Sequence, residues 1–167
     1  MSHTETVVMS VGGSLIVPNE IDTLFLAKFR ELINKEITEN KRKFIIIAGG
    51  GTTARHYQAA ARTIGGLNSD DLDWLGLHAT RLNGHLLRTI FRDLAFRVMI
   101  TNPDEVLDVP PMESLIIAAG YRPGSSTDLR AIQIAERIGA KKVINLSNTD
   151  YIYTANPAED DQAAPIK

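Results

Sequence analysis

Four large apolar residues in a row, at positions 44–47, are typical of a strand buried on both faces inside a parallel sheet. Three glycines, Gly49, Gly50 and Gly51, end this strand, and the helical spacing of residues 54, 57, 58, 61 and 64 predicts that a helix follows. Glycines at such a turn let backbone amides approach an anion, and the helix N-terminus adds a partial positive charge. We therefore interpret residues 49–51, called the glycine turn below, as a phosphate-binding element, with Arg55 as a two-pronged donor one helical turn further on.

Apolar runs and polar breaks elsewhere predict four further strands, at residues 6–11, 97–101, 114–119 and 142–146. They also predict helices over residues 18–40, 69–94 and 129–138, and a loop or irregular short helix over 102–111. The basic run 41–43 is expected to be a solvated loop. The third helix of the chain presents Asp73, Thr80 and Gly84 on a face of their own. Apolar positions of these three helices predict the following core-facing residues: Ile21, Leu24, Phe25, Leu32, Ile33, Ile37, Leu72, Leu75, Ala79, Leu82, Leu86, Ile90, Leu94, Leu129, Ile132, Ala135 and Ile138.

This order of strands and helices predicts an α/β fold, a three-layer α/β/α sandwich with a mainly parallel central sheet, in a single domain over residues 1–167. Ligands of such sheets bind beyond the carboxyl ends of the strands. Four predicted strand ends carry small or polar residues, at 12–14, 49–53, 120–128 and 147–150. We therefore expect these loops to meet around one phosphorylated ligand.

Composition narrows the function further. Hydrophobic residues make up 44% of the chain and charged residues 23%, as in ordinary globular domains. The net charge of −2 gives no reason to expect a nucleic acid or an anionic membrane as partner. The chain has no cysteine, which excludes disulfides and thiolate zinc sites. Neither a secretory leader nor a membrane-spanning apolar stretch is evident, so a cytoplasmic protein is expected.

Other nucleotide motifs fit poorly. Gly49, Gly51 and Ala54 match the dinucleotide fingerprint, but the acidic residues at the expected distance begin a helix instead of ending a strand. The chain contains no P-loop sequence and no serine in a nucleophile-elbow context. The helical histidines at positions 56, 78 and 85 lack a metal-ligand spacing. Backbone amides, arginines and hydroxyls remain, and these groups suit phosphoryl transfer.

Five stretches of the chain resemble motifs of the amino acid kinase superfamily, and within it those of the archaeal-type uridylate (UMP) kinases. Residues 11–15 resemble the first nucleotide loop, and residues 49–55 resemble the glycine-rich loop with its downstream arginine. Residues 73–83 resemble the helix whose aspartate holds the acceptor ribose, and residues 123–128 resemble the loop around the acceptor phosphate and uracil. Residues 148–157 resemble the segment around the adenine and ribose of ATP. The five matches occur in the family's order and spacing over nearly the whole chain.

The resemblance implies transfer of the γ-phosphoryl group of ATP to UMP, in pyrimidine nucleotide biosynthesis, with Mg²⁺ and in a hexamer. It implies catalytic roles for Arg55 and Asp128, and it assigns no side chain as a metal ligand. ATP would be bound by Gly12, Gly13, Ser14, Gly51, Arg55, Ser147, Asn148, Tyr153 and Asn156. UMP would be bound by Gly50, Asp73, Gly120, Tyr121, Arg122, Pro123, Gly124, Ser125, Ser126 and Thr127.

Several residues depart from the family pattern. Ser10 stands where many relatives carry a lysine, Tyr151 where glycine is usual, and Asn156 where an ATP-contacting aspartate is usual. Ser125 and Ser126 replace bulkier residues, and relatives continue past the position of Lys167, so the domain is expected to lack the C-terminal part of the ATP half. Two alternatives therefore stay open. One is a kinase of another small acid or phosphate, such as the isopentenyl phosphate kinases, which place a histidine near the position of His56. The other is a non-catalytic nucleotide-binding storage or regulatory protein resembling the molybdenum storage proteins.

Overall fold

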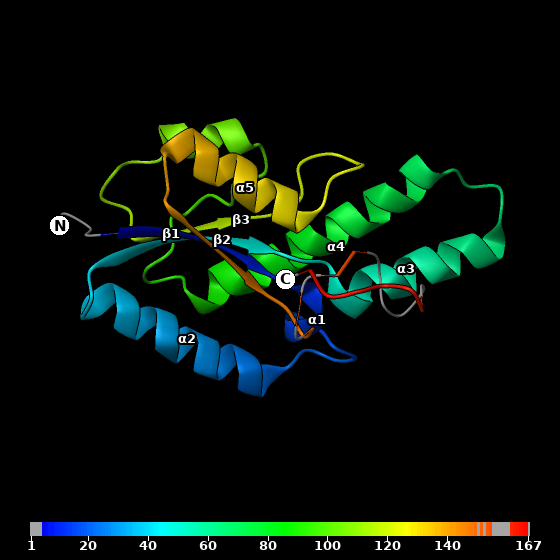
Figure 1. Cartoon of the computed structure of the whole chain (residues 1–167), viewed down its shortest axis with the longest axis horizontal. Helices are drawn as coiled ribbons and strands as arrows, with labels where there is room; N and C mark the ends of the chain where they lie inside the picture. Colours follow the sequence, from blue (N-terminus) through cyan, green and yellow to red (C-terminus); the bar gives the residue numbers. More distant parts are fainter. Residues whose placement is uncertain (1–4, 150, 152, 155–160, 167) are drawn as a thin grey trace.

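The computed structural model describes residues 5–149, 151, 153–154 and 161–166. Its elements follow in the order β1 (Glu5–Val11), α1 (Gly13–Ile16), α2 (Thr23–Thr38), β2 (Arg42–Ala48), α3 (Gly51–Ile64), α4 (Ser69–Ile90), η1 (Pro103–Asp108), β3 (Leu115–Ala118), α5 (Thr127–Ile138) and β4 (Lys142–Leu146). The four strands form one parallel sheet in the order β3-β2-β1-β4, with helices on both faces (Figure 1). The predicted three-layer α/β fold with a parallel sheet is confirmed.

The register of the sheet brings the ends of all four strands to one edge. Val11 at the end of β1 pairs with Ala48 at the end of β2 and with Leu146 at the end of β4. On the far side of β2, Ile47 pairs with Ala118, the last residue of β3. The loops that begin at residues 12, 49, 119 and 147 therefore start side by side, as the sequence predicts.

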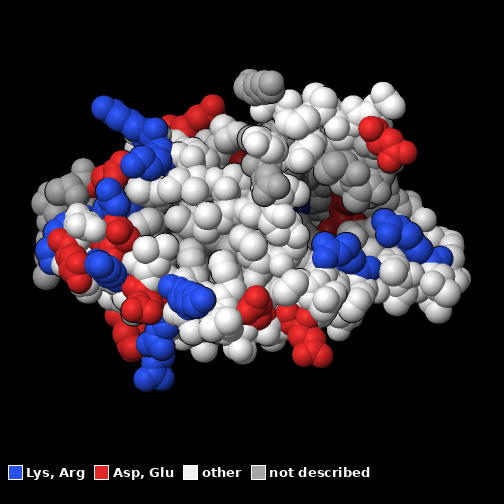
Figure 2. Space-filling model, turned by 60° about the horizontal axis from the view of Figure 1, so that its bottom comes forward, with Lys and Arg blue, Asp and Glu red and all other residues white. Residues whose placement is uncertain are grey.

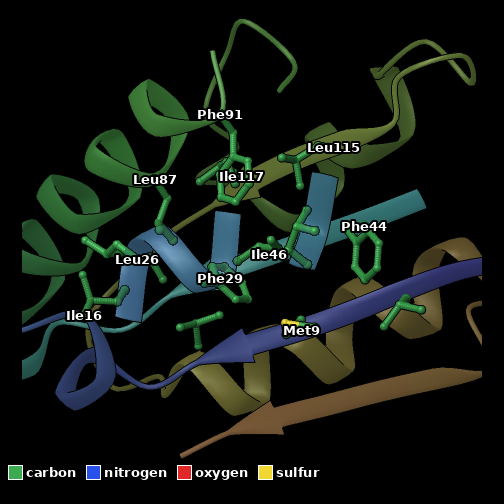
Figure 3. Packing of buried hydrophobic residues seen from close by; sticks show 14 of the residues in the cluster. Met9, Ile16, Leu26, Phe29, Phe44, Ile46, Leu87, Phe91, Leu115 and Ile117 are labelled. Carbon is green, nitrogen blue, oxygen red and sulfur yellow. The ribbon is translucent and has the colours of Figure 1, made fainter. Parts of the chain in front are cut away.

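Strand residues alternate between two hydrophobic cores, because successive side chains of a strand point to opposite faces. On one face Met9, Ile46 and Ile117 pack against α2 and α4, as Figure 3 shows. On the other face Val8, Ile45, Ile47 and Ile116 pack against α5 and the segment 106–109. Coverage of both faces explains the nearly unbroken apolar runs of β2 and β3, whereas β4, at the edge of the sheet, is largely exposed.

Helix α2 begins later and buries a different face than predicted. Its first turn is capped by Asp22, whose Oδ1 accepts a hydrogen bond of 2.8 Å from the backbone N–H of Phe25, so residues 18–21 lie outside the helix. The buried residues of this helix are Leu26, Phe29, Ile33 and Ile37, spaced by three or four positions. The prediction is correct for Ile33 and Ile37 and wrong for Ile21, Leu24 and Leu32, which are exposed.

The predicted core faces of α4 and α5 also need correction. Helix α4 is capped by Asn68 and buries Leu77, Ala79, Asn83, Gly84 and Leu87, while the predicted core residue Leu82 is 63% exposed. Helix α5 buries Arg130, Ala131, Ile134 and Ala135, so Leu129 and Ile132 are exposed instead of inward. Apolar spacing alone misplaced these faces because both helices bury a polar side chain, Asn83 in α4 and Arg130 in α5.

The predicted strand over residues 97–101 is absent from the described structure. Residues 95–100 follow the outer edge of β3 and contact it through only two isolated bridges, Ala95 with Leu115 and Ile100 with Ala118. Val98, which lies between these two bridges, is exposed, so the middle of this segment does not pack against the sheet. Residues 103–108 form a short 3₁₀ helix, in line with the irregular helix predicted there.

The basic run 41–43 is not the solvated loop that was predicted, because Arg42 and Lys43 are the first residues of β2. The guanidinium of Arg42 bridges two carboxylates, Glu5 of β1 at 3.1 Å and Glu36 of α2. Lys142 of β4 binds the other oxygen of Glu5 at 2.9 Å. Opposite charges on neighbouring elements therefore allow this strand to begin with basic residues.

This charge cluster predicts a loss of stability in acid. The pKa of Glu5 is lowered from 4.5, first by a hydrogen bond from Lys142 and further by Arg42. The pKa of Glu36 is also lowered, first by a hydrogen bond from Asn40 and then by Arg42. Since both carboxyl groups bind protons more weakly in the folded chain, their contribution is complete above the unfolded value of 4.5 and is lost as the pH falls through the lower folded values.

We expect Arg42→Met to lower the Tm at neutral pH. We also expect the Tm of this variant to fall less than that of the wild type as the pH drops below 4.5. Thermal unfolding followed by circular dichroism over a series of pH values measures both effects. Arg92→Met is the control, because exposed Arg92 pairs only with its neighbour Asp93 among the described residues. If the Tm of Arg42→Met depended on pH as that of the wild type does, the charge cluster would contribute nothing to stability.

Charges of both signs are interspersed at the two ends of one face of the molecule, and uncharged residues occupy its middle (Figure 2). The described residues on that face therefore form no continuous patch of a single sign. None of the helices in the described part of the chain combines the length and the apolar character needed to cross a lipid bilayer.

Candidate active site

The turns that follow β1 and β2 approach each other so closely that only glycine fits at their contact. A Cβ atom on Gly13 would lie 1.9 Å from the backbone nitrogen of Gly51, and one on Gly51 would lie 2.2 Å from the carbonyl oxygen of Gly13. Gly51 also has a φ of +62°, a conformation that side chains other than glycine rarely adopt. The glycine turn therefore begins α3 directly against the start of α1.

A buried side chain of α4 holds the glycine turn in place. Asn83 is 3% exposed, and its Nδ2 donates to the carbonyl oxygens of Gly49 at 2.8 Å and Gly50 at 3.1 Å. Sequence reasoning placed Asn83 within a motif but gave it no role. A polar residue among the apolar positions of a helix was the available signal, because buried amides need partners.

We expect Asn83→Ala to destabilise the fold by about 1–3 kcal/mol, because it removes the side-chain donor to two carbonyl groups of the turn. The carbonyl oxygen of Gly50 keeps one hydrogen bond of 3.4 Å, from the N–H of Ala54. This destabilisation corresponds to a Tm decrease of about 2–12 °C for a chain of this size. Asn19→Ala, at an exposed position before α2, is the control and should leave the Tm unchanged. Equal Tm values for the two variants would contradict this role of Asn83.

Helix α4 also fixes the loop that follows β3. The carboxylate of Asp73 accepts a hydrogen bond of 2.9 Å from the N–H of Gly124, and Thr80 Oγ1 accepts one of 2.8 Å from the N–H of Gly120. Arg81 donates to the carbonyl oxygens of Gly120, at 3.1 Å, and Tyr121, at 3.3 Å. Asp73 and Thr80, which the sequence places on one face of this helix, thus both face the loop 120–124.

These contacts enclose a pocket of about 480 Å³, called the first pocket below. It is lined by the glycine turn, α3, α4, the loop 120–126 and the start of α5: Gly50, Gly51, Ala54, Arg55, Gln58, Asp73, Gly76, Leu77, Thr80, Gly120, Arg122, Pro123, Gly124, Ser125, Ser126, Thr127 and Arg130. All residues predicted to bind UMP line it except Tyr121. The glycine turn and the loop 120–126, about 70 residues apart in the sequence, thus meet here. Of the four strand-end loops expected around one ligand, these two share the first pocket, whereas Ser147 and Thr149 line a different pocket and residues 12–14 line neither.

Arg55 points into this pocket from the second turn of α3. Its Nη2 donates to Thr52 Oγ1, and that hydroxyl in turn donates to the carbonyl oxygen of Pro18. The arginine is thereby tied to the loop that joins α1 to α2. Its neighbour His56 is exposed and does not line the first pocket.

A second pocket, of about 640 Å³, lies on the other side of the start of α5. It is lined by Ser10, Asp128, Ala131, Ile132, Val143, Asn145, Ser147, Thr149 and Tyr151. The carboxylate of Asp128 accepts a hydrogen bond of 2.6 Å from Ser10 Oγ and one of 3.2 Å from Asn145 Nδ2. Consecutive residues of α5 therefore serve different pockets, Thr127 the first and Asp128 the second.

The residues predicted to bind ATP are spread around this edge of the sheet. Gly12 is anchored by a hydrogen bond of 2.8 Å from its N–H to the carbonyl oxygen of Leu146, and Gly13 and Ser14 begin α1. Ser147 lines the second pocket, Asn148 is exposed outside both pockets, and Tyr153 forms an isolated bridge with Pro165. Asn156 lies outside the described residues. Among those that are described, no three His, Cys, Asp or Glu side chains are grouped closely enough to hold a metal ion.

The sequence profile of the Amino acid kinase family matches residues 5–167. The chain belongs to this family. Among curated members, it is 36% identical to a uridylate kinase of Methanocorpusculum labreanum and 35% identical to one of Methanospirillum hungatei. These alignments cover 94% and 95% of this chain but 66% and 65% of those proteins, so this amino acid kinase chain spans slightly less than two thirds of their length.

Solved structures agree with this family assignment. The crystal structure of uridylate kinase from Archaeoglobus fulgidus is similar with a TM-score of 0.77 and 31% identity, covering 95% of this chain and 71% of that chain. A UMP kinase from Bacillus anthracis shares the fold, with a TM-score of 0.67 at 16% identity over 95% of this chain and 71% of that chain. The resemblance to archaeal-type uridylate kinases that the five motifs indicate is confirmed.

Proposed function

We propose that this chain catalyses transfer of the γ-phosphoryl group of ATP to UMP. The observation that carries this proposal is the first pocket, in which the glycine turn, Arg55 and Asp73 face the loop 120–127. That arrangement offers amides and a guanidinium to a phosphate at one end and a carboxylate to ribose hydroxyls beside it. The uridylate kinases among the relatives support the same reaction.

In the proposed reaction, an oxygen of the UMP phosphate attacks the γ-phosphorus of ATP, and the bond from that phosphorus to the β,γ-bridging oxygen breaks. ADP leaves and UDP forms, so no covalent intermediate on the protein is needed. UMP occupies the first pocket, with its phosphate at Gly50, Gly51 and Arg55. ATP approaches from Gly12, Gly13 and Ser14. Arg55, between the two, stabilises the negative charge that spreads over the transferred group.

Mg²⁺ is proposed to arrive with ATP. Magnesium is usually held by one or two carboxylates together with substrate phosphates, so the lack of a three-ligand group among the described residues is compatible with it. When bound, it neutralises phosphate charge. We assign the carboxylate ligand to Asp128, which lines the second pocket and is oriented by hydrogen bonds from Ser10 and Asn145.

Coupled measurement of ADP release tests the proposal, with ATP, Mg²⁺ and each of UMP, CMP, AMP, GMP and isopentenyl phosphate as acceptor. We expect turnover with UMP. Turnover with another acceptor alone would instead favour a kinase of a different small phosphate. Binding of ATP or UMP by calorimetry without any turnover would favour the non-catalytic alternative, with Ser10 and Tyr151 as the residues to examine first.

We also propose that the chain acts in pyrimidine nucleotide biosynthesis in the cytoplasm and forms one domain per subunit.

Six copies of the chain are proposed to assemble into a hexamer. Helices α3 and α4 lie side by side and extend beyond the sheet (Figure 1). They and their connection expose five large apolar side chains, Tyr57, Ile64, Leu67, Trp74 and Leu82. Apolar surface of this kind supports association with other copies of the chain. Sedimentation velocity measures the subunit number, and a monomer would contradict the proposed assembly.

A further inference from the structure

A buried arginine lines the first pocket, and none of the residues that the structure describes gives it a counter-charge. Arg130 of α5 is only 4% exposed, although it lines the first pocket, and its Nε has no hydrogen-bond partner within the described part of the chain. Its Nη1 donates to Gln133 Oε1 at 2.6 Å, and its guanidinium lies 5.2 Å from the centre of the Tyr121 ring. Burial of a charge is costly unless the charge is paired.

The groups around Arg130 do not supply the missing negative charge. Burial lowers the pKa of Arg130, and the next contribution is the like charge of Arg122; Arg137 adds to it, and only Tyr121 opposes it. No carboxylate contributes among the described residues, and Asp73 in the same pocket binds Gly124. A buried arginine that faces like charge and no carboxylate among the described residues therefore makes this part of the pocket unfavourably positive.

A second buried polar group in the same pocket also has no partner among the residues with described positions. Ser125 Oγ is inaccessible to solvent and makes no hydrogen bond with any described residue. Ser125 and Arg130 both line the first pocket, one from the loop and one from α5. Buried hydroxyl and guanidinium groups are nearly always hydrogen-bonded, so two such groups at one pocket indicate a ligand that completes them.

We propose that Arg130 and Ser125 bind the phosphate group of the acceptor in the first pocket. This inference rests on the proposed function, since it adds Arg130 to the same acceptor site and assigns Ser125, already expected to bind UMP, to the phosphate. A phosphate fits because it brings negative charge as well as several acceptor oxygens, and a guanidinium matches it in shape. The neutral carbonyl groups of a base would satisfy the donors but would leave the buried charge uncompensated.

The inference predicts that Arg130 is needed for the bound state and not for the empty fold. Arg130→Met keeps the apolar length of the side chain and removes its charge. We expect it to bind UMP about 10–100-fold more weakly, as for loss of a hydrogen bond between charged groups, and to bind uridine as the wild type does. Without ligand, its Tm should equal or exceed that of the wild type, because an unpaired buried charge is gone.

The test combines two measurements. Calorimetry measures binding of UMP, uridine and inorganic phosphate, and thermal unfolding measures the Tm of the chains without ligand. Arg137→Met is the matched control, since Arg137 lies two helical turns further along α5 and pairs with Asp104 outside the pocket. Arg130→Lys should recover part of the affinity for UMP, because it restores the charge without the planar fork. Ser125→Ala should weaken UMP binding but leave uridine binding unchanged.

The outcomes separate this inference from the proposed function. If wild-type and Arg130→Met chains bind UMP equally, or if Arg130→Met weakens UMP and uridine alike, Arg130 does not bind the phosphate, while the proposed function stands. If the wild type binds inorganic phosphate but not UMP, and Arg130→Met loses the phosphate, the inference stands and the proposed acceptor is wrong. A fall of the unliganded Tm in Arg130→Met would assign the arginine a structural role and overturn the inference.

Discussion

A Gly13→Ala chain should be destabilised by at least about 3 kcal/mol, the upper end of the usual cost of overpacking, and should lose nucleotide binding. The added methyl group would lie 1.9 Å from the nitrogen of Gly51 and 2.6 Å from the carbonyl carbon of Gly50. Both are backbone atoms, so no side-chain rotation relieves the contact. Either the glycine turn moves away from α1 or the end of the sheet distorts, and both changes disturb the first pocket.

The neighbouring glycine provides the control for this prediction. In Gly12→Ala the nearest atom to the new methyl group would be the carbonyl oxygen of Leu146, at 3.0 Å, so a shift of a few tenths of an ångström suffices. Urea unfolding of both variants measures the difference, and calorimetry with UMP and ATP measures binding. Gly13→Ala with the stability of Gly12→Ala would show that the two strand ends are not packed as described.

Arg55→Met should reduce kcat/KM by about 100–1,000-fold and leave the Tm nearly unchanged. A preorganised donor to the transition-state charge contributes about this much in other active sites. Arg55 is exposed at the pocket and bonds only to Thr52 among the described residues, so its removal opens no cavity in the core. The loss should appear mainly in kcat, because the charge on the transferred group is greatest in the transition state.

Arg62→Met is the matched control, since it removes an exposed arginine from the same helix, two turns away from the pocket. Steady-state kinetics with UMP and ATP compare the two variants. Equal activities of Arg55→Met and Arg62→Met would remove Arg55 from the mechanism. A rise of KM for both substrates with kcat unchanged would assign it to binding alone.

Much of the fold was predictable because buried parallel strands leave a strong signal in the sequence. The apolar runs at β1, β2 and β3 and the shorter one at β4, which is largely exposed, each end at glycine or small residues, so their order and their shared edge could be inferred. The helix faces were less predictable, since two apolar stripes compete on each helix. In α2 tertiary packing decides between them, while the cap at Asp22 fixes where the helix begins, which the more prominent Pro18 obscured.

The site was predictable as far as its glycines, Asp73 and the loop 120–127 are concerned, because their residue types are tied to turns and helix starts. Tertiary contacts decided the rest. Asn83 holds the glycine turn and Arg130 lies beneath the loop, yet both lie in helices at positions that the apolar stripe leaves undetermined. The separation of Thr127 and Asp128 into two pockets also depends on how α5 lies across the sheet.

The position of β1 in the interior of the sheet has a consequence during synthesis on the ribosome. β1 pairs with β2 on one edge and with β4 on the other, and the second pairing joins Val7 to Lys142. Its β4 edge therefore stays open until residues 142–146 have emerged. An apolar strand with an open edge recruits other chains, so nascent or truncated forms that lack residues 142–146 should aggregate where the longer chain stays dispersed.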